Sequence, residues 1–306
     1  MRAQIIGLSF VVLLIGGCAR LDANLFDPQP LSEYKWEDYA GKRELTVPDT
    51  LLVDPAKITQ LSLDSGSPGN TVKIAGVFIG DTDRLSNSDY RVILYSHGNK
   101  KHLDYYWNRI KLLANVGGKN NYGVMAVDYR GYGMSEGEPS EEGLYEDVDA
   151  AMQWLSDKGL SEDRLYLYGY SLGTAPTVEL ATKPRTLKPA KVILESPFAS
   201  SAVMVQGAAI LDLPSSFVTN VKINNAEKVK NMSQPLLWFH GTDDSFLSIS
   251  AHGELVFANH PGIENSDKFA QRIAGAEHNN VPQVIADQQG GFQTYLDIIS
   301  TFLQSQ

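Results

Sequence analysis

The residues best suited to nucleophilic chemistry lie in the pentapeptide Gly169-Tyr170-Ser171-Leu172-Gly173. It follows an apolar run at 165–168 and precedes a helical pattern at 174–182, so the sequence predicts a strand, a tight turn and a helix in succession. The two glycines avoid steric clash in such a strained turn. The turn would present the Ser171 hydroxyl at a helix N-terminus, where backbone N–H groups stabilise an oxyanion. Ser171 is therefore the candidate nucleophile, and a chance motif in an ordinary turn is the alternative.

A serine hydroxyl needs an imidazole to take its proton and a carboxylate to orient that imidazole. The sequence resembles the α/β-hydrolase family, whose nucleophile, acid and histidine follow in this order. The segment His240-Gly241-Thr242-Asp243-Asp244 matches the family's His-Gly-x-x-Asp, so the resemblance implies Asp244 as the acid, with Asp243 as the less favoured choice. After the last expected strand comes His278, which the resemblance implies is the general base. Taken singly, these residues would be a turn-capping aspartate and a loop histidine.

The resemblance also implies an oxyanion hole built from the backbone N–H groups of Leu172 and Asn99. Asn99 lies in His97-Gly98-Asn99, directly after the expected central strand at 92–96. His97 and His240 each begin a His-Gly element, and we expect both to orient their loops rather than to act as bases.

A second loop element, Asp-Tyr-Arg-Gly-Tyr-Gly-Met-Ser at 128–135, closely matches the family's Asp-x-Arg-Gly-x-Gly-x-Ser. Its glycines indicate a tight loop beside the active site, and Asp128 and Arg130 are expected to hold its geometry. The segment does not fit a dinucleotide site, because Glu136 stands where a third glycine is needed. The chain also has no P-loop and no His-Glu-x-x-His zinc motif, so we predict no cofactor and no metal.

The elements that must position these residues alternate along the chain from residue 58. Strands are expected at 58–63, 72–79, 92–96, 124–129, 165–168, 191–195, 236–240 and 269–273, and helices at 106–114, 143–158, 174–182, 249–257 and 292–303. Compact apolar strands separated by helices indicate a mostly parallel sheet covered on both faces, and the first two strands suggest an antiparallel hairpin at its edge. The prediction is an α/β-hydrolase fold with an eight-stranded sheet and no large cap domain.

Composition narrows the function further. The chain has 306 residues, of which 43% are hydrophobic and 20% charged, as expected for one large globular domain with a short extra segment. Its net charge is −10, and its longest basic run is Lys100-Lys101, which argues against nucleic acid as a partner. A single cysteine excludes an intrachain disulfide framework, a cysteine-based zinc site and an iron–sulfur cluster.

That cysteine ends a segment with the layout of a signal peptide: Met1-Arg2, an apolar run at 5–15, then Gly16-Gly17-Cys18. The run is too short to cross about 30 Å of hydrocarbon. The pattern resembles the bacterial lipobox, which implies cleavage before Cys18 and its lipidation; an uncleaved anchor or a short buried helix is the alternative.

Several acyl chains would hold the protein durably on a membrane of the bacterial cell envelope. Because no Asp follows Cys18, the resemblance favours the outer membrane if the organism has one. The expected organisation is a signal peptide at 1–17, the lipidated cysteine with a tether or extension at 18–57, and the hydrolase domain at 58–306.

The substrate is indicated only by resemblance. Glu195-Ser196-Pro197-Phe198 resembles a segment of the membrane-associated, single-domain α/β-hydrolase-domain proteins related to depalmitoylating thioesterases, which implies a small acyl ester or thioester substrate. The apolar segment 199–214 is either a lid or pocket wall, or a helix covering the sheet. Two segments, 100–102 and 245–248, depart from the family pattern. Because of these departures, the resemblance does not identify the acyl group or the leaving group of the substrate. A peptidase or amidase of the same fold and a non-catalytic binding lipoprotein remain the alternatives.

Overall fold

The computed structural model describes residues 26–208 and 221–305. Its strands are β1 (Asp27–Pro28), β2 (Ile58–Ser65), β3 (Val72–Ile79), β4 (Arg91–Ser96), β5 (Lys100–Lys101), β6 (Tyr122–Val127), β7 (Leu165–Tyr170), β8 (Lys191–Glu195), β9 (Leu236–Gly241) and β10 (Lys268–Ile273). Its α-helices are α2 (Leu103–Leu113), α3 (Glu141–Asp157), α4 (Thr174–Thr182), α5 (Ser201–Ala208), α6 (Asn225–Lys228), α7 (Gly253–Asn259), α8 (Val281–Gln289) and α9 (Phe292–Gln304).

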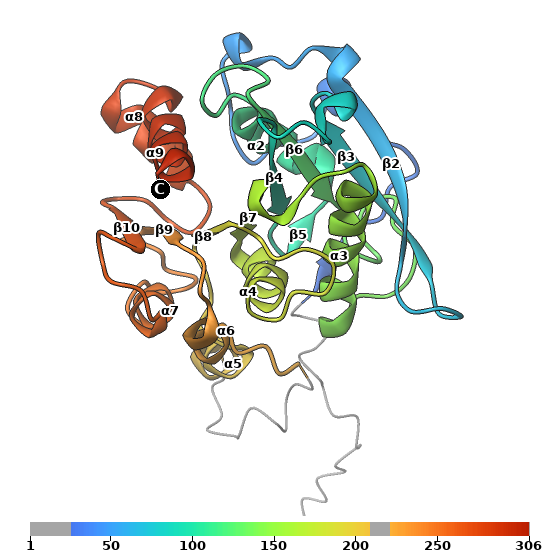
Figure 1. The fold of residues 1–306 in the computed structure, drawn as a ribbon. Coiled ribbons are helices and arrows are strands. Elements are labelled where there is room, and N and C mark those ends of the chain that lie inside the picture. Colours follow the sequence, from blue (N-terminus) through green and yellow to red (C-terminus); the bar gives the residue numbers. More distant parts are fainter. Residues whose placement is uncertain (1–25, 209–220, 306) are drawn as a thin grey trace, which may run out of the picture.

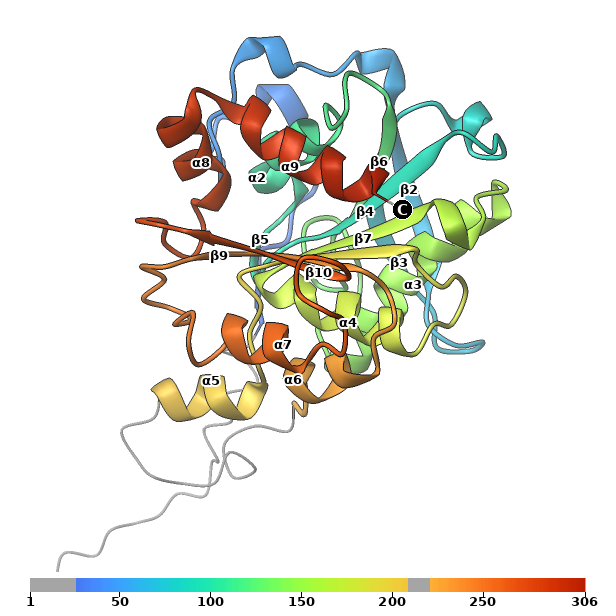
Figure 2. The same ribbon diagram turned by 60° about the vertical axis from the view of Figure 1, so that its left-hand side comes forward.

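Eight of these strands form one sheet, in the order β10-β9-β8-β7-β4-β6-β3-β2. β2 and β3 pair antiparallel, β3 is antiparallel to β6, and the remaining neighbours are parallel. Figures 1 and 2 show α2, α8 and α9 on one face of the sheet, with α3, α4, α6 and α7 on the other. Every residue of β6, β7, β8 and β9 is buried, as expected for parallel strands covered on both faces. The predicted mostly parallel eight-stranded α/β sheet is confirmed.

Helices α7 and α8 differ from the sequence-based expectation, and the short α6 was not expected either. The helix expected at 249–257 begins only at Gly253, because the N–H groups of Ala251 and His252 both donate to the Ser248 carbonyl in a preceding turn. Helix α8 was not expected at all. Its Pro282 lies in the first turn, where the missing N–H removes no helix hydrogen bond, and it buries Val281 and Ile285.

Two expectations fall partly or wholly outside the described residues. Of the segment 199–214, α5 covers the first part, and residues 209–220 are not described, so the choice between lid and covering helix stays open. The signal peptide and Cys18 also lie outside the described residues. Among the helices that the structure does describe, none has the length and apolar character needed to cross a membrane.

The N-terminal extension is packed from residue 26 onward. Phe26 and Leu45 are buried, and Leu45 belongs to the core cluster that also contains residues of α2. β1 pairs in parallel with β5, and Gly133 exchanges backbone hydrogen bonds with Gln29 and Leu31. Residues 26–57 therefore pack against the rest of the domain, so this part of the expected tether or extension at 18–57 is a packed extension.

Candidate active site

The turn that carries Ser171 has the strained backbone that the sequence predicted. Ser171 has φ 51°, in the left-handed region, at the junction of β7 and the helical turn before α4. A Cβ at Gly173 would lie 2.0 Å from the carbonyl oxygen of Ser96, and one at Gly169 would lie 2.6 Å from the carbonyl oxygen of Gly173. Real Cβ atoms do not approach so closely, so both positions require glycine.

Ser171, His278 and Asp244 lie in one hydrogen-bonded row. Ser171 Oγ is 2.8 Å from Nε2 of His278, and Nδ1 of the same ring is 2.8 Å from Oδ2 of Asp244. Asp244 follows β9 and His278 follows β10, so both stand at the carboxyl ends of parallel strands, as Ser171 does. Asp243 is exposed and accepts a hydrogen bond from the Thr242 hydroxyl instead. The geometry thus favours Asp244 over Asp243 as the partner of His278.

The surroundings of Asp244 favour its charged form. Its Oδ1 accepts hydrogen bonds from the backbone N–H groups of Phe246 and Leu247, at 3.0 and 2.7 Å. Nε2 of His240 lies 3.1 Å from Oδ2. Burial by itself would raise the pKa of Asp244, but the contacts with His240, His278 and the Leu247 N–H outweigh it and hold the pKa below its usual range. The sequence predicted that His240 orients its loop, and it missed this contact with the acid.

A cavity of about 280 Å³ opens beside the Ser171 hydroxyl. Its lining is largely aromatic and polar, and consists of Gly98, Asn99, Lys100, Tyr105, Tyr106, Tyr170, Ser171, Ser245, Phe246, Glu277, His278 and Asn279. Asn99 therefore faces the same space as Ser171, while Leu172 follows Ser171 in the turn and is buried. The oxyanion roles of both residues stay predictions.

The loop that carries Asn99 is anchored through His97. The buried His97 ring has Nδ1 2.7 Å from the carbonyl oxygen of Gly98 and Nε2 3.1 Å from Oδ1 of Asp128. The Tyr129 hydroxyl donates to the His97 carbonyl at 2.7 Å. Nδ1 is thus hydrogen-bonded within the loop and Nε2 lies against Asp128, which agrees with an orienting role for His97 and Asp128.

Aromatic side chains from two segments lie in or near the cavity. Tyr105 and Tyr106 line it, whereas Trp107 is buried in the core and donates from Nε1 to Glu37 at 2.9 Å. Phe246 lies in the segment that departs from the family pattern; it is 65% exposed, and its ring centroid is 5.0 Å from that of His278.

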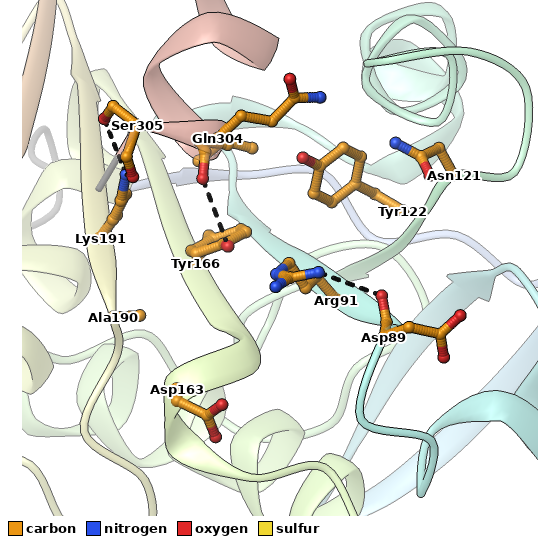
Figure 3. A pocket seen from close by; sticks show the side chains of 11 residues that line it. Asp89, Arg91, Asn121, Tyr122, Asp163, Tyr166, Ala190, Lys191, Gln304 and Ser305 are labelled. Atoms are coloured by element: carbon orange, nitrogen blue, oxygen red, sulfur yellow. Dashed lines mark hydrogen bonds between the residues drawn. The ribbon is translucent and has the colours of Figure 1, made fainter.

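A second, polar cavity of about 450 Å³ lies at the other end of the sheet, where β4, β6, β7 and β8 begin (Figure 3). Its buried cation, Lys191, already donates to the carbonyl oxygen of Phe302 and to the Ser305 hydroxyl, at 2.7 and 2.9 Å. These contacts fix the end of α9. In the described part of the chain, no three His, Cys, Asp or Glu side chains are grouped as a metal site.

Curated proteins resemble this chain over about two thirds of its length. The family described as "Serine aminopeptidase, S33" matches residues 87–234. The chain is 33% identical over 199 residues to α/β hydrolase domain-containing protein 17C of Mus musculus, covering 65% of this chain and 57% of that protein. It is 32% identical over 218 residues to α/β hydrolase domain-containing protein 17B of Xenopus tropicalis, covering 70% and 67%.

The match thus spans somewhat more than half the length of the mouse relative. Among solved structures, an esterase from Pyrococcus furiosus superposes with a TM-score of 0.63 at 18% identity, covering 91% of this chain and 98% of the esterase chain. This likeness confirms the predicted fold.

Proposed function

Because the chain belongs to the α/β-hydrolase family, we propose that it is a serine hydrolase that cleaves carboxylic esters or thioesters through an acyl-enzyme intermediate. The observation that carries the proposal is the row of contacts from Ser171 Oγ through the His278 imidazole to the Asp244 carboxylate, at 2.8 Å each. Ser171 and His278 line a cavity that is large enough for a short acyl group.

The proposed reaction has two halves. Ser171 Oγ attacks the acyl carbonyl carbon while His278 Nε2 takes the hydroxyl proton, and Asp244 holds the Nδ1–H tautomer and stabilises the imidazolium. The carbonyl oxygen becomes an oxyanion, which accepts hydrogen bonds from backbone N–H groups of Leu172 and Asn99. His278 then gives its proton to the departing alcohol or thiol. Water, deprotonated by the same imidazole, then attacks the acyl carbon. The bond from that carbon to Ser171 Oγ breaks, Oγ takes the proton back from His278, and the carboxylic acid leaves.

The cavity walls support an acyl substrate. Tyr105, Tyr106, Tyr170 and Phe246 give it an apolar lining, and aromatic walls of this kind favour a hydrocarbon chain over a charged group.

The test is covalent labelling of the full chain in detergent with a fluorophosphonate probe, together with turnover of a short aryl ester. We expect labelling of the wild type and of Ser300→Ala, a control serine on α9 that lies outside the cavity lining. Ser171→Ala should lose the label, and its turnover should fall by about 10³-fold or more. Full activity in Ser171→Ala would overturn the assignment. A folded wild type that neither labels nor turns over ester would instead favour a non-catalytic binding lipoprotein.

A peptidase or amidase is the second candidate, favoured by the match to the family described as serine aminopeptidase. An aminopeptidase must bind the substrate's ammonium group, and Glu277 is the carboxylate among the cavity-lining residues. Its Oε2 is already engaged by the Ser245 hydroxyl, at 3.0 Å. Comparing aryl esters with aminoacyl amides separates the two: preference for amides, lost in Glu277→Gln and kept in Glu264→Gln, would favour the peptidase.

We also propose that the protein is held on a bacterial envelope membrane by lipidated Cys18. The support is the Ile15-Gly16-Gly17-Cys18 pattern after a short apolar run. Cys18→Ser in the full chain should release the protein from the membrane fraction, whereas unchanged partitioning would contradict lipidation.

A further inference from the structure

The N-terminal residues 26–45 lie against the loop that carries Asn99. We call these residues the strap; they precede the first strand of the main sheet, and nothing in their sequence pattern pointed to the active site. The strap contacts the loop at two places, one at Asn99 and one through the partner of His97.

At the first place, the Asn99 side chain is turned to the strap. Its Oδ1 accepts hydrogen bonds from the backbone N–H of Asp27, at 3.0 Å, and from the Tyr132 hydroxyl, at 2.9 Å. The Asp27 N–H is also 3.2 Å from the Tyr132 oxygen, so the three groups form one cluster. β1 continues the contact, because Asp27 is in register with Lys100, a residue of the cavity wall.

At the second place, the strap reaches His97 through Asp128. The Tyr34 hydroxyl donates to Oδ2 of Asp128 at 2.6 Å, and the other carboxylate oxygen lies 3.1 Å from Nε2 of His97. The backbone N–H of Leu103, just beyond the loop, donates to the same Oδ2 at 3.1 Å. Asn99, at the end of the segment 97–99, is therefore bonded to the strap directly. His97, at its start, lies against Asp128, the residue to which the strap is bonded.

Buried polar contacts hold the strap itself in place. The buried carboxylate of Asp104 accepts the backbone N–H groups of Lys35 and Trp36, at 2.9 and 2.7 Å. Farther along, Glu44 forms a fully buried ion pair with Arg109 of α2, at 2.6 Å. Since α2 begins four residues after Asn99, the strap, the loop and α2 are joined as one unit.

We propose that the strap is a positioning element of the candidate active site, which fixes the segment 97–99 so that the Asn99 backbone N–H faces the developing oxyanion. The inference rests on the proposed hydrolase function. An oxyanion donor acts only when it is held close to its productive position, and a shift of about 1 Å is enough to lower the rate strongly. The strap holds that backbone in place through the hydrogen bonds that the Asn99 side chain accepts.

The first test removes one oxygen from the cluster. In the full chain, Tyr132→Phe should lower kcat for a short aryl ester by about 10-fold with KM changed less than about twofold, because the oxyanion develops only in the transition state. The matched control is Tyr166→Phe, which also loses one tyrosine hydroxyl. Tyr166 lies near the start of β7, at the end of the strand opposite Ser171, and lines the polar cavity (Figure 3). A merely structural role would lower the melting temperature of both variants alike and leave kcat unchanged.

The second test separates the Asp27 N–H from the Asp27 side chain. Asp27→Pro removes the donor and should lower kcat by about 10-fold. Asp27→Ala keeps the N–H and should retain wild-type kcat. Equal kcat in wild type, Tyr132→Phe and Asp27→Pro would overturn the inference while leaving the hydrolase proposal intact. Absence of Ser171-dependent turnover in the wild type would instead remove the proposed function, and the inference with it.

Discussion

Nε2 of His240 lies 3.1 Å from Oδ2 of Asp244, the carboxylate oxygen that also contacts His278. The same His240 nitrogen is 2.9 Å from the carbonyl oxygen of Leu247. A carbonyl oxygen can only accept, so this nitrogen carries the proton and donates it to Leu247 while also contacting Asp244. The candidate acid is thus held by two imidazoles, one that joins it to Ser171 and one that fixes it from the core.

The first prediction concerns that second imidazole. His240→Phe keeps an aromatic ring but removes the donor, so Asp244 should hold His278 less well and kcat should fall by about 10-fold. His260→Phe is the control, because His260 is a buried histidine that contacts the carbonyl oxygen of Gln234 instead. It should lower the melting temperature without lowering kcat. Steady-state kinetics on an aryl ester would contradict the prediction if both variants kept the wild-type kcat.

The second prediction concerns acid stability. The pKa of Asp244 is lower in the folded protein than in the unfolded chain, because the hydrogen bonds it accepts outweigh its burial. Ionised Asp244 therefore stabilises the fold above the pH at which an unfolded aspartate titrates, about pH 4, and this stability is lost as the pH falls toward the folded pKa. The free energy of unfolding lost in Asp244→Asn should be largest above about pH 5 and shrink below about pH 4. Urea unfolding from pH 3 to pH 7 measures it, and a pH-independent loss would contradict the prediction.

Much of this architecture was predictable because its signals are local. Apolar strands and amphipathic helices follow from short sequence periods, and the expected helix at 174–182 coincides with α4 (Thr174–Thr182). The proximity of Ser171, Asp244 and His278 was predictable because each follows a strand in a recognisable motif, and parallel strands bring their carboxyl ends to one edge of the sheet.

The strap was not predictable in this way. Its attachment depends on single long-range contacts, such as Tyr34 with Asp128 and Glu44 with Arg109, whose partners are more than sixty residues apart along the chain. No local period encodes them, and turn-forming residues such as Pro28 and Pro30 resemble those of a linker. The contact of His240 with Asp244 was missed for a different reason, since the motif specifies the residues but not which atoms meet.

The third prediction tests the close approach at the Ser171 turn. Gly173→Ala would place its Cβ 2.0 Å from the backbone oxygen of Ser96, so β4 or the turn must move. We expect a loss of about 3 kcal/mol or more in the free energy of unfolding, with loss of ester turnover. Gly69→Ala is the control: its φ of +86° is strained for alanine, but no atom lies within 4 Å of the new Cβ. It should cost about 1 kcal/mol and leave turnover unchanged.

The fourth prediction concerns the buried ion cluster under Tyr170. The Arg109 guanidinium lies between the carboxylates of Glu44 and Glu195, at 2.6 and 2.7 Å, with all three side chains buried. Arg109→Met would leave two unpaired buried carboxylates and should cost about 3–5 kcal/mol. Because burial already raises the pKa of Glu44, adding Glu44→Gln should recover part of that loss. Chemical denaturation of the two single variants and the double variant measures the coupling, and strict additivity would contradict it.

The last prediction assigns Phe246 to substrate binding. A phenylalanine that is 65% exposed contributes little to the fold, yet this one lines the cavity beside His278. Contact with a hydrocarbon chain would bury its ring, and losing that contact costs about 1–1.5 kcal/mol, or roughly tenfold in affinity. Phe246→Ala should therefore raise KM about tenfold for esters with longer acyl chains and change it little for acetate esters.

Ile263 provides the matched control for Phe246. It is 71% exposed and lies outside the cavity lining, so Ile263→Ala removes a comparable exposed apolar side chain away from Ser171. Neither variant should change the free energy of unfolding by more than about 0.5 kcal/mol. A chain-length series of aryl esters distinguishes the two: only Phe246→Ala should flatten the dependence of KM on acyl length. An unaltered dependence in Phe246→Ala would show that the acyl chain lies elsewhere, leaving the tyrosine wall of Tyr105, Tyr106 and Tyr170 as the surface to test next.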